Sequence, residues 1–187
     1  TSTIAGSGGL KMETGASSAS SSGSLSLSTG SAIDSSGSLA LSSGASLSGA
    51  GGTISVVGLD SKETGSSIVL QAGLSSESTG GSIQLASGTG QLASGAVSMI
   101  TSASLAGASG SIAVGTGNGD ISGSLNIATG NGLTNSGDIT VSGGSTTTGQ
   151  GSSVLIQAGT SSASTGGMLE VLSGSGKEFS GSIQVLS

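Results

Sequence analysis

The residues that could carry chemistry are few: the chain of 187 residues has nine acids and three Lys, and it has no His and no Cys. Without His or Cys it has neither the base of a Ser-His-Asp triad nor a thiolate nucleophile. The residue counts alone do not exclude a catalytic Ser–Lys pair or a pair of catalytic carboxylates, but the acids are scattered along the chain. We interpret the acids as solvated turn charges. The sequence therefore predicts no enzyme activity, no catalytic residue and no cofactor.

The stretch GTGNGD, from Gly115 to Asp120, is the nearest approach to a ligand-binding motif. A phosphate-binding Gly loop would need a following helix and usually a Lys, and neither is expected here. The calcium-binding β-roll repeat needs carboxylates from successive turns, and no neighbouring turn repeats Asp120. We therefore predict no metal site. If this turn did bind calcium, Asp120 would be the acid that it uses.

Charge and hydropathy exclude two kinds of partner. The formal net charge is −6, and the three cations, Lys11, Lys62 and Lys177, are far apart. Nucleic-acid binding needs clustered cations that displace counterions from phosphates, so we predict no nucleic-acid partner. No apolar run approaches the roughly 20 residues of a membrane span, so we predict none.

Gly and Ser dominate the chain, which would suit a flexible linker. However, 33% of residues are hydrophobic, the mean hydropathy is +0.30, and the hydrophobic residues recur periodically. An apolar-x-apolar pair returns every thirteen to fifteen residues, which gives thirteen repeats from Leu10 to Val185. Each repeat has the form G-S-apolar-x-apolar-x-small-Gly, as in GSLSLSTG and GSIQLASG. Its closing Gly permits positive φ and a sharp corner.

Period-two alternation over five residues predicts a half-buried strand. Stacked copies would bury a common stripe of aliphatic residues, so we expect an all-β fold, a single parallel β-solenoid (β-helix) array over residues 1–187. The expected arrangement is one repeat per coil, and two or three repeats in coils of about 29 or 43 residues remain the alternative. The expected ladder consists of Leu25, Leu27, Leu39, Leu41, Ile54, Val56, Ile68, Leu70, Ile83, Leu85, Ile112, Val114, Leu125, Ile127, Ile139 and Val141.

One stretch of the sequence occurs twice in closely similar form. GSSIVLQAGLSSESTGG begins at Gly65, and GSSVLIQAGTSSASTGG begins at Gly151, six repeats later. This similarity indicates duplication of a six-repeat block. In both copies an aliphatic residue, Val69 or Leu155, replaces the small polar residue found between most other apolar pairs. Drift after duplication would explain this, and the alternative is a lateral docking point for a partner or a sister chain.

The outward face of the expected strands is the other feature that could bind a ligand or a surface. It carries mostly Ser, Ala, Gln, Asn and Thr, without the regular Thr ranks typical of ice-binding solenoids. Glycan sites usually use aromatic platforms, and Phe179 is the one aromatic residue. A surface-binding module for carbohydrate, mineral or ice therefore stays as the alternative function.

The tandem G-[SD]-[ILV]-x-[ILV]-x-[STA]-G unit resembles repeats in long surface proteins of diatoms and other stramenopile algae. Similar units occur in phage fibres and bacterial adhesin stalks. The resemblance implies an extracellular or cell-surface location and a fibrous or adhesive role, without catalytic residues. We expect a structural fibre, scaffold or spacer, a fragment of a longer repeat protein. Its expected partners are itself, end to end or laterally, or other fibre and matrix proteins.

Overall fold

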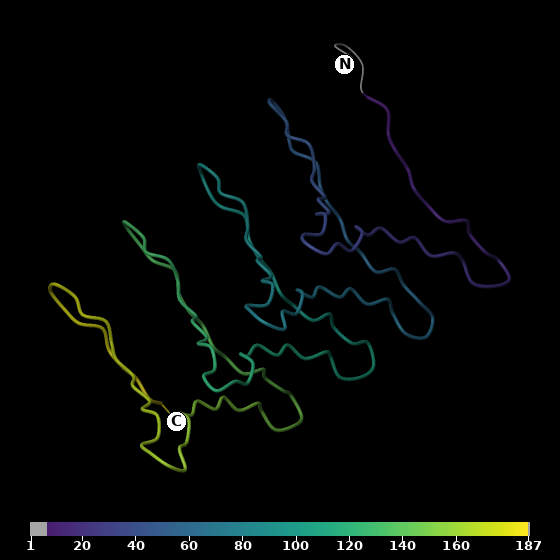
Figure 1. Ribbon diagram of the computed structural model, residues 1–187. Helices are drawn as coiled ribbons and strands as arrows, with labels where there is room; N and C mark the ends of the chain where they lie inside the picture. The colour runs from purple at the N-terminus through teal and green to yellow at the C-terminus, as the bar shows by residue number, and fades with distance from the viewer. Residues whose placement is uncertain (1–6, 187) are drawn as a thin grey trace. The chain divides into compact units, whose positions relative to one another are not determined.

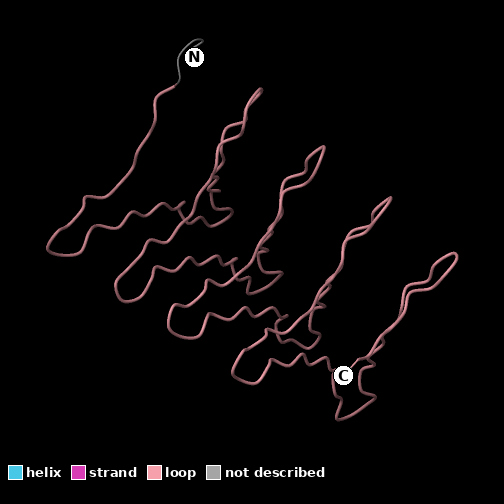
Figure 2. Ribbon diagram, turned by 180° about the vertical axis from the view of Figure 1, so that it is seen from behind, coloured by secondary structure: helices cyan, strands magenta, loops and turns pink. Residues whose placement is uncertain are grey.

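The computed structural model describes residues 7–186, and none of these residues lies in a helix or a strand (Figure 2). Almost all of them are exposed to solvent, and only Ala72, Ser75 and Ala158 are partly covered. No hydrophobic or polar residue of this part is buried. Residues 7–186 therefore form an extended, non-globular chain without secondary structure.

The expected β-solenoid is therefore wrong. None of the sixteen ladder residues, from Leu25 and Leu27 to Ile139 and Val141, lies in a strand, and their exposed fractions run from 46% to 76%. A strand needs a second backbone about 4.8 Å away in hydrogen-bonding register. In residues 7–186 the backbone hydrogen bonds join only short-range pairs at five places. Alternation correctly describes an extended backbone, but it does not supply the neighbouring backbone that a strand requires.

The total exposed area makes the same point in a single quantity. The chain exposes 18786 Å² to solvent. A compact protein of this mass would expose roughly 7,700 Å², and a fully unfolded chain roughly 24,600 Å². The chain therefore removes only a modest part of its surface from water, and it does so locally.

What repeats along the chain is a linear segment followed by a closed loop (Figure 1). Each linear segment holds one apolar pair, and each loop contains a bend. The two ends of a loop approach one another at a point that we call the neck, where a Gly of one passage lies close to the other passage. There are twelve such loops in the described part: 14–23, 29–37, 43–52, 58–66, 73–81, 88–95, 101–110, 116–123, 129–137, 144–152, 159–167 and 174–181.

Hydrogen bonds close many of the necks. In some, a side-chain hydroxyl donates across the neck to a backbone carbonyl, as Thr14 Oγ1 does to Gly23 O at 3.1 Å. In others the backbone makes the bond, as Gly95 N–H does to Gly88 O at 2.9 Å. A Ser or Thr next to a Gly can therefore close a loop of eight or nine residues without any secondary structure. The other hydroxyl donors at necks are Thr29, Ser66 and Ser152.

Hydroxyls also fix the bend inside several loops. The Oγ of Ser17 accepts a hydrogen bond from Ser20 N–H at 3.0 Å, and Ser46 does the same for Gly49 N–H at 2.9 Å. Such side-chain-to-backbone bonds three residues apart replace the backbone bond of an ordinary turn. The abundance of Ser thus has a local structural use: it holds bends in residues 7–186, where no core is buried.

The chain divides into two units, Thr1–Val97 and Ser98–Ser187. Each unit contains six of the twelve loops, and the boundary falls inside the linear segment that holds Val97 and Met99. Each unit thus holds six repeats of the loop, and the duplication of a six-repeat block stays a prediction.

The glycines of the described residues allow two backbone segments to approach closely, and they do not adopt unusual dihedral angles. No Gly of the described residues has positive φ, so the expected positive-φ corner after each apolar pair is wrong. At Gly81, which begins a segment after a neck, an added Cβ would lie 3.2 Å from Gly73 N. Gly130, which follows an apolar pair, has open space around it. At this neck the Gly that begins the next segment is thus the one that the close approach requires.

Candidate functional site

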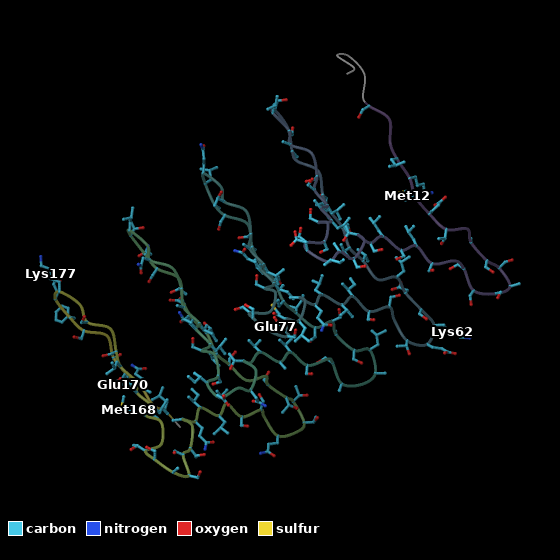
Figure 3. The ribbon with its side chains drawn as sticks, viewed as in Figure 1. Met12, Lys62, Glu77, Met168, Glu170 and Lys177 are labelled. Atoms are coloured by element: carbon cyan, nitrogen blue, oxygen red, sulfur yellow. The ribbon has the colours of Figure 1, made fainter. Side chains whose placement is uncertain are left out.

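The charged groups form one ion pair among the described residues. Lys11 Nζ lies 2.6 Å from a carboxylate oxygen of Glu13, and the two side chains are 80% and 63% exposed. A pair in this much water contributes little to stability. The other two cations, Lys62 and Lys177, project from separate loops (Figure 3). The charges of residues 7–186 thus gather into no site.

The GTGNGD stretch lies across the loop 116–123, with Asp120 at its bend. An added Cβ at Gly119 would lie 3.2 Å from the Ile121 carbonyl oxygen, so the Gly is there for a tight turn. Within residues 7–186, no three acids come together as possible metal ligands. This loop therefore shows the geometry of a bend and no arrangement of ligands.

The described part of the chain also encloses no pocket. None of its residues forms a helix with the length and apolar character needed to cross a bilayer. Any binding by residues 7–186 would thus use an exposed surface of segments and loops.

Trypsin offers a direct check of this exposure. We expect cleavage after Lys11, Lys62 and Lys177 at similar rates, because all three are exposed and outside secondary structure. Proteases act on locally open chain, so urea at a concentration that the protease tolerates will change the rates by no more than about twofold. Mass spectrometry of a digestion time course measures this. A protected Lys62 that becomes sensitive only in urea would contradict the open loop at 58–66.

The two duplicated stretches have the same local geometry. We call residues 65–81 and 151–167 the twin stretches. In each, a backbone bond of 2.9 Å closes the neck, from Gly81 N–H to Gly73 O and from Gly167 N–H to Gly159 O. The same two stretches contain all three partly covered residues of the described part. Similar sequence thus gives the same neck twice.

The bends of the twin stretches agree as well. Ser75 Oγ accepts from Ser78 N–H at 3.0 Å, and Ser161 Oγ accepts from Ser164 N–H at 2.9 Å. Each loop is therefore held at two points, at its neck and at its bend. The twin stretches thus share the same two fastenings, which loops 14–23 and 144–152 also have at neck and bend.

The aliphatic residues that distinguish the twin stretches are open to solvent. Val69 is 78% exposed and Leu155 is 82% exposed, and both lie in the linear segment ahead of the loop. Their equivalent neighbours, Ile68 with Leu70 and Val154 with Ile156, are exposed too. The structure thus leaves the predicted docking residues accessible, and docking itself stays a prediction.

Sequence reasoning missed the neck. Thr14 and Thr29 look like small inward residues of a strand, but their hydroxyls close loops by bonding to Gly23 and Gly37. The signal was present as a hydroxyl residue followed, eight or nine positions later, by the Gly that opens the next segment. A local hydrogen bond explains this spacing without any stacked coil.

Comparison with protein-family models, with curated proteins and with solved structures finds no match to this chain. The fibre and adhesin roles that the resemblance implied thus gain no support from a family. Residues 7–186 also contain no β-structure. The description of the chain as a fibre or adhesin-like protein built from β-strands is therefore wrong.

Proposed function

We propose that this chain is a structural spacer, an extended repetitive segment that separates whatever lies on either side of it. The observation that carries the proposal is the twelvefold alternation of an exposed linear segment with a neck-closed loop. Hydrogen bonds within the loop itself close many of these necks, so repeats can be added without rebuilding a shared core. The length of such a spacer is set by the number of repeats.

The composition supports the same role. Gly/Ser-rich chains behave as flexible coils whose mean end-to-end distance grows roughly as the square root of residue number. Closing loops at their necks shortens the path and removes part of that flexibility. A low density of charge, with 6% charged residues, limits unspecific attraction to neighbouring molecules.

Distances between loops test the proposal. The chain has no Cys, so pairs of introduced Cys can carry spin labels without background. Ile33, Leu47 and Leu92 suit labelling because they lie in loops of one unit and are fully exposed. We expect the mean distance from position 33 to position 92 to be about twice that from 33 to 47, since four repeats rather than one separate them.

Equal distances would overturn the spacer, because they would mean that the repeats fold back on one another. Adding urea provides the control. Urea should lengthen both distances only slightly, as necks open, and a large expansion would reveal a compact state.

A further inference from the structure

The twin stretches each contain three bulky aliphatic residues in succession, Ile68–Val69–Leu70 and Val154–Leu155–Ile156, which no other segment has. Successive side chains of an extended backbone point to opposite sides. Most other segments place a small or polar residue between their two aliphatic residues, so only one side is apolar. The two triplets are apolar on both sides.

The exposed area of the triplets is large enough to matter. Their six residues are between 51% and 82% exposed, so each triplet is a separate patch of roughly 375 Å², similar in size to the largest apolar patch of a typical soluble monomer, which is often functional. A dimer that paired both triplets could cover at most roughly 750 Å² per chain, close to the roughly 800 Å² that each partner contributes to a standard interface.

Nothing in the triplets opposes contact with another apolar segment. No charged residue occurs in 65–76 or in 139–169, so no ion would have to be desolvated. Within residues 7–186, the backbone groups of both triplets make no hydrogen bond. They are free to bond with a second chain that lies alongside.

We propose that the two triplets form a pairing surface for a second copy of this chain. The surface is uncharged and occurs once in each unit. A second copy carries the same two triplets, so each triplet has an identical partner to pair with. A self-complementary surface of this kind is what a symmetric homodimer requires. This inference goes beyond the spacer, since a spacer can act as a single chain.

Sedimentation equilibrium of the full chain tests the pairing. The test variant carries Val69→Ser and Leu155→Ser, which make both triplets resemble ordinary segments such as GSLSLSTG. The matched control carries Leu47→Ser and Leu133→Ser, which remove one exposed aliphatic residue per unit from loops. Because neither variant changes a buried residue, neither can act by unfolding a core.

We expect the unaltered chain and the control to dimerise with the same Kd, in the micromolar range. The test variant should dimerise about a hundredfold more weakly, because each dimer loses four aliphatic contacts. A monomer at all concentrations up to about 100 μM would overturn the proposal. So would equal weakening in the test variant and the control, which would mean that any exposed aliphatic residue serves.

Discussion

Heating a dilute solution of the monomeric chain will produce no cooperative unfolding transition. Cooperativity in a small protein comes from the simultaneous exposure of a shared core, and no described residue of this chain is buried. A folded protein of this length would unfold with a heat-capacity change of about 2.5 kcal/mol/K and an enthalpy of about 130 kcal/mol. We expect neither in scanning calorimetry, and a gradual, near-linear change in far-ultraviolet circular dichroism.

The same solution should scatter X-rays as an expanded chain. A compact protein of 187 residues would have a radius of gyration of about 16 Å, and a fully unfolded one about 46 Å. The value for this chain should lie well above the compact figure and change little on heating. A sharp endotherm with a radius near 16 Å would show a buried core, and the exposed segments described above would then be wrong.

The period of the repeats could be predicted from the sequence, but whether neighbouring repeats pair with one another could not. Apolar pairs such as Leu125 with Ile127 correctly mark the linear segments, and the Gly/Ser stretches between them correctly mark the loops. Strand pairing was wrong because alternation is a property of one backbone, whereas a sheet is a property of two.

The candidate docking site was predictable in part. Val69 and Leu155 stand out from the sequence alone, because both break the same polar position six repeats apart. What the sequence did not reveal is the ordered loop behind each of them, since a bond such as Ser78 N–H to Ser75 Oγ depends on a local conformation. Many Ser residues share that neighbourhood, and only some make the bond.

The glycines show how a repetitive sequence can hide distinct roles. In the loop 129–137, Gly130 has open space around it, whereas an added Cβ at Gly132 would collide with the Asn135 carbonyl oxygen. The same contrast recurs at Gly88 with Gly90, where the obstacle is the Ala93 carbonyl. Two Gly residues that are two positions apart thus differ in whether they can tolerate an added Cβ.

Replacing Gly132 with Ala should therefore open the loop 129–137, and replacing Gly130 with Ala should not. The added methyl group would sit well inside van der Waals contact with the Asn135 carbonyl oxygen, so the backbone from 132 to 135 must move. No buried surroundings hold the loop in place, and it will relax by losing its bend. Amide chemical shifts should change across the whole loop in the first variant and only beside the substitution in the second.

The loop 174–181 provides an independent repeat of this comparison, with Gly174 in open space and Gly176 against the Phe179 carbonyl oxygen. Gly176→Ala should behave like Gly132→Ala and open its loop. Gly174→Ala should behave like Gly130→Ala and leave its loop closed. Because each loop closes through its own neck, neither change should reach the neighbouring loops. Shifts that spread beyond the altered loop would mean that the repeats are coupled, and the chain would then be more than a series of locally closed units.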